Sequence, residues 1–236
     1  MILHYLQHVP FEGIGNIETW AQSSVHTINS TRLYADEKLP SPDAFDLLIV
    51  MGGPMNVYEE NAYPFLIREK RFIEQAIQNG KSVLGICLGS QLLATVLGAK
   101  VFKNKFEEIG WFPVEKTDEA KAKTLLSSLP ERFTTFHWHG DTFEIPHGAK
   151  RIYKSEACAN QGFIYGDKII GLQFHPEVDE TTLKLMIENE GDGITVNEFV
   201  QSPQTILEQQ NFKANAGMLA TLLDEMTKTI RLENKA

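Results

Sequence analysis

One cysteine lies where a mostly apolar run meets a helix-like run, and this junction constrains the fold more than any other part of the sequence. Residues Ser82–Ile86 predict a buried strand, and residues 88–97 have the apolar spacing of a helix. Gly85 and Gly89 flank Cys87, and they remove the Cβ atoms that would clash in a tight strand-to-helix turn. The junction therefore predicts a nucleophile elbow that holds the Cys87 thiol clear of its neighbours.

The start of the predicted helix adds an electrostatic reason for cysteine at this turn. The N–H of Leu88 would point from the helix N-terminus, where unpaired amides and the helix dipole favour a thiolate and a developing oxyanion. A lone cysteine after an apolar strand is more often a small buried residue, and the flanking glycines favour catalysis at Cys87 over that alternative. Cys158 lacks such glycines and is expected to be structural.

A nucleophile requires a base and a group that orients the base, and the segment His175-Pro176-Glu177 offers both. It follows an apolar run at residues 168–174, and proline stiffens an extended segment in which residues i and i+2 share a face. We therefore expect His175 to face Cys87 while Glu177 orients the imidazole ring. The alternative is a histidine at a strand end, with Glu177 as an ordinary acid before a helix predicted at 181–188.

Both motifs, Gly-x-Cys-x-Gly-x-Gln at 85–91 and His-Pro-Glu at 175–177, resemble those of class I glutamine amidotransferases in full and in the same order. The resemblance covers residues 1–188 and is strongest to the amidotransferase domain of GMP synthase and to stand-alone proteins similar to it. It implies a Cys87–His175–Glu177 catalytic triad, which needs no metal and no organic cofactor.

The resemblance also implies the residues that hold the substrate. The segment Gly52-Gly53-Pro54 follows a predicted strand at 46–51 and is similar to the family's second oxyanion loop, in which the Gly53 amide would join that of Leu88 as a donor. The segment Trp138-His139-Gly140-Asp141 corresponds to the part that faces the α-amino and α-carboxylate groups of glutamine, although Trp138 replaces a residue that is usually polar. Gln91 is either a helix-surface residue or one whose amide reaches the substrate or the Gly52 loop.

The spacing of apolar residues predicts an α/β fold. Strands are expected at 2–6, 24–28, 47–51 and 83–86, with a helix over 65–77 that ends at Asn79-Gly80. This alternation indicates a doubly wound, mostly parallel sheet flanked by helices, and the resemblance implies the flavodoxin-like form of that fold. The pattern then changes to short strands at 100–172, which predict a small antiparallel β meander.

The C-terminal part is predicted with less detail. A final helix packs on the sheet through an apolar face formed by Leu219, Leu222, Leu223, Met226 and Ile230. The stretch 189–217 is rich in Gly, Asn and Gln, with a short helix near Ile206. It is open whether this stretch forms a lid, a homodimer contact or a mobile insertion. We expect a single domain over residues 1–236, with a core at 1–188 and a less typical extension at 189–236.

Composition excludes several other classes. The chain has 236 residues, of which 42% are hydrophobic, which is enough to bury a sizeable core. Its net charge of −9 opposes nucleic-acid binding. The N-terminus has no basic region, and no apolar run approaches the ~18 residues of a membrane span, so we expect a cytoplasmic protein. The 2 cysteines suggest neither a disulfide framework nor a metal knuckle.

A metal site is the main rival interpretation. His137 and His139, followed by Asp141, would lie on one face of an extended strand and could ligate a metal, as in a metallohydrolase. The family pattern already explains His139-Gly140-Asp141, and no second cluster of Cys, Asp or Glu completes an open catalytic site. We therefore predict no metal.

The function implied is hydrolysis of the glutamine side-chain amide through a γ-glutamyl thioester, with release of ammonia. The sequence has no pyrophosphate loop and no glycine-rich phosphate loop with lysine, so a separate synthetase chain would have to receive the ammonia. An alternative is a stand-alone hydrolase of γ-glutamyl peptides such as glutathione. A non-enzymatic binding domain is disfavoured because every residue of the triad is present.

Overall fold

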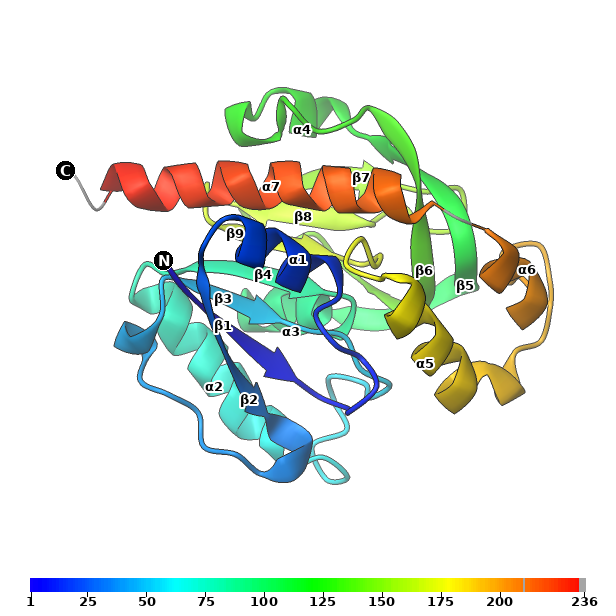
Figure 1. Cartoon of the computed structure of the whole chain (residues 1–236), viewed down its shortest axis with the longest axis horizontal. Helices are drawn as coiled ribbons and strands as arrows, with labels where there is room; N and C mark the ends of the chain where they lie inside the picture. Colours follow the sequence, from blue (N-terminus) through cyan, green and yellow to red (C-terminus); the bar gives the residue numbers. More distant parts are fainter. Residues whose placement is uncertain (210, 234–236) are drawn as a thin grey trace.

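The parallel half of the fold carries the predicted elbow. The computed structural model describes residues 1–209 and 211–233, and its strands form one nine-stranded sheet. Neighbouring strands of one half run parallel in the order β2, β1, β3, β4, β9 (Figure 1). Their bounds are β1 (Ile2–Gln7), β2 (Thr27–Arg32), β3 (Leu47–Val50), β4 (Ser82–Ile86) and β9 (Ile169–Leu172).

The antiparallel meander predicted at 100–172 continues the same sheet. Its strands are β5 (Val101–Lys116), β6 (Arg132–Phe143), β7 (Lys150–Lys154) and β8 (Gly162–Tyr165). Strand β8 pairs antiparallel with β9, and the order continues through β7 and β5 to β6. Strands β5 and β6 span 16 and 12 residues, so they are not short as expected, because the two pair along most of their lengths around one bulge.

Helices cover both faces of the parallel half, which confirms the doubly wound α/β fold. On one face α1 packs against α7, and on the other α2 packs against α3 (Figure 1). The helices are α1 (Asn16–Ser23), α2 (Phe65–Gln78), α3 (Leu88–Val96), α4 (Asp118–Lys121), α5 (Glu180–Glu190), α6 (Pro203–Glu208) and α7 (Phe212–Glu233). Single 3₁₀ turns occupy Leu33–Ala35, Pro42–Ala44, Thr124–Leu126 and Gly191–Gly193.

The strand predicted at 24–28 is wrong in its boundaries. Helix α1 ends at Ser23, and Val25 follows in a turn with φ 54 and 89% exposure. Strand β2 begins only at Thr27, which pairs with Ile2 at the start of β1. The apolar residue at Val25 therefore belongs to an exposed turn and not to the sheet.

The far end of the sheet curls back over the elbow. Strand β6 is last in the strand order, yet it contacts α3, and its Phe136 forms an isolated bridge with His175 beyond β9. The backbone N–H of His175 donates to the Phe136 carbonyl at 2.8 Å. An edge strand of the antiparallel half thus closes over the carboxyl ends of β4 and β9.

The C-terminal segments pack on the antiparallel half and on the helices. The final helix is confirmed as α7, and the apolar face predicted for it is buried. In the stretch left open at 189–217, Val200 pairs with Ile109 of β5. Helix α6 packs its fully buried Ile206 next to Trp111, whose Nε1 donates to the Ile206 carbonyl at 3.1 Å. These described residues therefore pack on their own chain.

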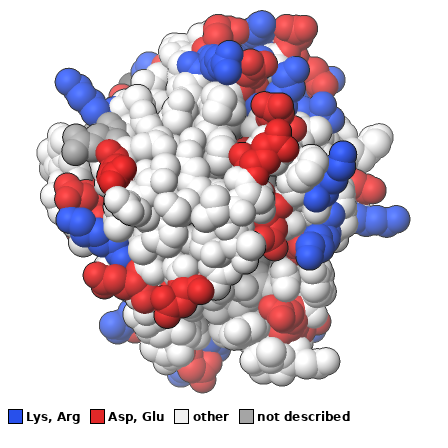
Figure 2. Space-filling model, turned by 90° about the vertical axis from the view of Figure 1, so that its right-hand side faces the viewer, with Lys and Arg blue, Asp and Glu red and all other residues white. Residues whose placement is uncertain are grey.

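The surface and the helices give two further observations. Figure 2 shows acidic and basic side chains interspersed around a broad uncharged area on one face, with no continuous basic patch there. None of the helices in the described part of the chain is long and apolar enough to span a bilayer.

Candidate active site

The elbow has a strained backbone that only its glycines allow. Cys87 lies between β4 and α3 with φ 50 and ψ −109, a conformation that L side chains rarely adopt. A Cβ on Gly85 would lie 2.5 Å from the Gly89 carbonyl oxygen, and a Cβ on Gly89 would lie 2.0 Å from the Val50 carbonyl oxygen. Both glycines are therefore required by close backbone contacts, as the sequence predicts.

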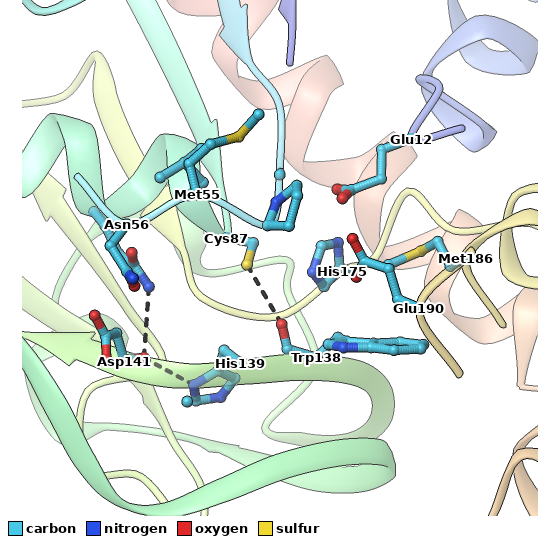
Figure 3. Close-up of a pocket in the computed structure, with 15 residues that line it drawn as sticks. Glu12, Met55, Asn56, Cys87, Trp138, His139, Asp141, His175, Met186 and Glu190 are labelled. Carbon is cyan, nitrogen blue, oxygen red and sulfur yellow. Dashed lines mark hydrogen bonds between the residues drawn. The ribbon is translucent and has the colours of Figure 1, made fainter. Parts of the chain in front are cut away.

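His175 and Glu177 form a buried pair beside the cysteine. His175 Nδ1 lies 2.8 Å from Glu177 Oε1, and each residue is 2% exposed. His175 Nε2 has no hydrogen-bond partner among the described residues, and Figure 3 shows the ring next to Cys87. Burial alone would lower the pKa of His175, but the nearby Glu177 and Cys87 raise it well above its ordinary value. This arrangement favours an imidazolium next to a thiolate.

The loop after β1 fixes the His-Pro-Glu turn, which the sequence did not predict. The Asn16 amide nitrogen donates to the Glu177 carbonyl at 2.8 Å, and Asn16 Nδ2 donates to the carbonyls of Pro176 and Val178 at 3.3 and 3.2 Å. Gly15 has φ 43, and a Cβ there would lie 2.2 Å from the Glu177 carbonyl oxygen. The Gly-Asn pair before α1 is the only sequence signal that could have pointed to this contact.

Two glutamines connect the cysteine to β6. Gln173 Nε2 lies 3.7 Å from Cys87 Sγ, and the Cys87 thiol donates to the Trp138 carbonyl at 3.6 Å. Gln91 is 4% exposed, and its Nε2 donates to Gln173 Oε1 at 3.1 Å and to the Asp141 carbonyl at 3.5 Å. Gln91 is thus not a helix-surface residue. Gln173 was not predicted, because the sequence gives no sign that a glutamine ends the buried run of β9.

These elements surround a pocket of about 210 Å³ (Figure 3). Almost every residue predicted for the site lines it, except Glu177 and Gly52. The Gly52 Cα faces the site, since a Cβ there would lie 3.1 Å from His175 Cε1 and 3.6 Å from Cys87 Cβ. The lining residues are Glu12, Gly53, Pro54, Met55, Asn56, Cys87, Leu88, Gln91, Trp138, His139, Gly140, Asp141, His175, Met186 and Glu190. Of these, the sequence gave no reason to expect Glu12, Met186 or Glu190.

The amides predicted to bind an oxyanion are available. Gly53 and Leu88 both line the pocket, and neither N–H donates a hydrogen bond to a described residue. The Leu88 N–H belongs to the first residue of α3, where the helix dipole adds to its effect.

A second buried His–Glu pair holds the glycine loop. His8 Nδ1 lies 2.8 Å from the Gly52 carbonyl oxygen, and His8 Nε2 lies 2.9 Å from Glu69 Oε1. Both residues are fully buried. Burial alone lowers the pKa of His8, but the Glu69 carboxylate raises it above its ordinary value, so both ring nitrogens can donate. Because a trans peptide directs its C=O and N–H oppositely, His8 also sets the direction of the Gly53 N–H.

The rival metal cluster differs from the one expected. His137 and His139 lie together, but their third partner is Glu108 of β5, and one ligand atom from each lies within 4.8 Å of the others. Asp141 is instead engaged by Tyr58, whose hydroxyl donates to Asp141 Oδ2 at 2.9 Å.

The Glu108 carboxylate is occupied by protein donors. Its Oε2 accepts from His139 Nε2 at 3.2 Å, from Ser155 Oγ at 3.1 Å and from Gln161 Nε2 at 2.5 Å. Burial lowers the pKa of His137 to about 4, so this ring is neutral. The cluster is a satisfied buried network behind the pocket, and His139 is its one member that lines the pocket.

Comparison with known proteins decides the family. The sequence pattern of the family described as glutamine amidotransferase class-I matches residues 16–192. The chain belongs to this family. Among its relatives is the glutamine amidotransferase-like protein YfeJ of Salmonella typhimurium, 32% identical over 233 residues, with 96% of this chain and 98% of YfeJ covered. The resemblance of the two motifs is thereby confirmed.

This amidotransferase also has solved structural relatives. A glutamine amidotransferase of Thermotoga maritima has a TM-score of 0.87 and 38% identity, with 96% of this chain and 97% of that chain covered. A GMP synthase of Thermomicrobium roseum is 36% identical over 141 residues, which cover 59% of this chain but only 25% of that enzyme. The protein is therefore an enzyme of the amidotransferase type, a C–N hydrolase with a cysteine nucleophile.

Proposed function

We propose that this enzyme hydrolyses the side-chain amide of glutamine through a thioester on Cys87. The observation that carries the proposal is the buried His175–Glu177 pair, whose unpartnered Nε2 lies beside the strained cysteine in one pocket. The Cys87 sulfur attacks the amide carbon, and the C–S bond forms as the C–N bond breaks. The proton at His175 Nε2 moves to the departing nitrogen, and water activated by the same ring then frees glutamate.

The oxyanion of each tetrahedral intermediate is bound by two backbone amides. The N–H groups of Gly53 and Leu88 serve as donors, since both line the pocket and both lack a partner among the described residues. Glu177 orients the His175 ring and stabilises its positive charge.

The rest of the pocket binds the amino-acid part of the substrate. Its volume of about 210 Å³ is below the roughly 300–1,000 Å³ of sites for drug-sized ligands, which supports a glutamine-sized molecule. The main-chain groups of Trp138, His139 and Gly140 and the Asp141 side chain face the α-amino and α-carboxylate groups. Gln91 braces this segment through the Asp141 carbonyl, and Gly52 and Pro54 complete the glycine loop.

The direct test is an assay with L-glutamine that measures glutamate and ammonia together. Equal amounts of both products are expected, and L-asparagine, which is one methylene shorter, should react far more slowly. Ammonia without glutamate, or equal rates on both amides, would contradict the proposal.

We also propose that a separate synthetase receives the ammonia, because this chain matches only 25% of the length of its GMP synthase relative. Fractions of cell extract that contain the partner should raise glutamine turnover above that of the isolated enzyme. Full turnover by the isolated enzyme that no fraction changes would instead indicate a stand-alone hydrolase.

His8 is expected to be required for a fast reaction through its hydrogen bond to the Gly52 carbonyl. The variant His8→Ala frees this peptide, and loss of one oriented oxyanion donor costs about 10²–10³ in kcat. KM should change little, and His8→Asn should restore part of the rate because its amide can donate to the same carbonyl. Steady-state kinetics check both values.

His4→Ala is the matched control, because His4 is also buried after the start of β1 but bonds to Thr31 Oγ1 at 2.9 Å. Thermal unfolding of all variants separates lost folding from lost catalysis. A folded His8→Ala enzyme with the kcat of the His4→Ala control would show that His8 has no part in the reaction.

A further inference from the structure

A buried carboxylate faces the pocket without a partner. Glu12 follows β1, is 5% exposed and lines the pocket. No described residue donates a hydrogen bond to its side chain, and only burial and unbonded charges act on it. A Cβ on Gly52 would lie 2.4 Å from Glu12 Oε2 and 3.1 Å from His175 Cε1, so the carboxylate and the catalytic ring converge on one point.

Glu12 lies on the side of the pocket from which the leaving group departs. Figure 3 shows Asn56 and Asp141 on one side of Cys87, and Glu12 and Glu190 on the other side with His175. The acid that protonates the leaving nitrogen must face that nitrogen, so the leaving group departs on the His175 side. The amino-acid part of the substrate then occupies the side of Asn56 and Asp141.

The charge state of this region also distinguishes it from a structural acid. Burial raises the pKa of Glu12 to about 7, and Glu190 and Glu177 add to the shift while His175 and His8 oppose it. Burial likewise raises the pKa of Glu190. A cation bound between the two would relieve an uncompensated burial of charge, whereas an anion would be repelled.

We propose that Glu12 and Glu190 form a cation subsite for the leaving group. The enzyme then prefers γ-glutamyl amides whose leaving amine carries a second, positively charged amino group, and it rejects leaving groups that end in a carboxylate, as peptides do. This inference rests on the proposed function. The chemistry of the step is the same as for glutamine, since the C–N bond breaks, His175 protonates the departing nitrogen, and the remote ammonium keeps its charge.

The test compares amides with leaving groups of similar length and different charge. The substrates are the γ-glutamyl amides of ethylenediamine, of ethylamine and of glycine, whose leaving groups carry a positive charge, no charge and a negative charge. We expect kcat/KM to fall in that order, with about tenfold or more between the cationic and neutral amides, given the strength of partly buried charges. Equal values, or the reverse order, would overturn the proposal.

Three variants assign the preference to the two acids. Glu12→Gln and Glu190→Gln remove charge with little change in shape, and each should bring the cationic-to-neutral ratio closer to one. Glu188→Gln is the matched control, because Glu188 lies on the same helix α5, is exposed and does not line the pocket. A ratio unchanged in both Glu12→Gln and Glu190→Gln would overturn the proposal.

The pH dependence gives a readout that needs no variant. As pH rises from 6 to 8, Glu12 passes through its pKa of about 7 and gains negative charge, while the remote amine, with a pKa near ~10, stays protonated. The cationic-to-neutral ratio should therefore increase. Titration of His175, Glu177, Glu190 and His8 acts on the shared glutamyl chemistry, and the Glu190→Gln variant separates the contribution of that acid. A flat ratio would contradict the role of Glu12.

Failure of this inference and failure of the proposed function are distinguishable. If Cys87→Ala removes all hydrolysis but the three amides react alike, the hydrolase assignment stands and the cation subsite is wrong. If hydrolysis of all three amides persists in Cys87→Ala, the proposed function itself is wrong.

Discussion

Replacement of Cys87 by alanine is expected to abolish glutamine hydrolysis, with a loss on the order of 10⁶ in kcat, as for other nucleophiles of catalytic triads. No other described side chain combines a nucleophilic atom with the φ of 50 that projects Cys87 into the pocket. An electrophilic glutamine analogue should label the wild-type chain once, at Cys87. Release of glutamate and mass spectrometry of the labelled peptide check the two parts.

The second cysteine provides the control. Cys158 is 2% exposed, its Sγ lies 3.2 Å from Thr142 Oγ1, and burial raises the pKa of its thiol. Cys158→Ala should therefore retain activity and labelling. Activity in folded Cys87→Ala, or label at Cys158 with Cys87 untouched, would refute the assignment.

The next largest effect is expected at the base of the triad. His175→Ala removes the group that moves protons in both half-reactions, and such groups contribute about 10²–10⁴ in rate. Glu177→Gln should cost less, because the amide oxygen can still accept from His175 Nδ1 and only the charge is lost. The kcat values of the two variants, compared with the wild type, measure the difference.

The same pair predicts a change in pH dependence. The pKa of His175 is raised well above its ordinary value partly by Glu177, so Glu177→Gln should lower the pKa of the imidazolium. The fraction of protonated His175 would then fall at a lower pH than in the wild type. A loss in folded Glu177→Gln equal to that of His175→Ala would show that Glu177 does more than orient the ring.

The triad was predictable because its signals are local. Gly85, Cys87 and Gly89 lie within one turn, and His175 and Glu177 lie two residues apart in an extended segment, so spacing alone gives their geometry. The sequence also shows which runs are strands. It does not show which strands are neighbours, and this decides which distant residues meet.

The residues that were missed all follow β1. The carboxyl ends of parallel strands meet at one edge of a sheet. In the observed order, β1 lies next to β3, and β3 lies next to β4. His8, Glu12 and Asn16 therefore reach the glycine loop and the His-Pro-Glu turn, with sequence separations of 44 for His8 and Gly52 and 160 for Asn16 and Pro176. No short-range pattern contains such a contact.

The curl of the sheet separates two tasks that evolution or design could change independently. The nucleophile and its base follow parallel strands β4 and β9, whereas the segment from Trp138 to Asp141 belongs to β6, an edge strand of the antiparallel half. New substrate preferences can thus arise by exchange of side chains on a single hairpin, β5–β6, while the backbone that strains Cys87 is inherited unchanged.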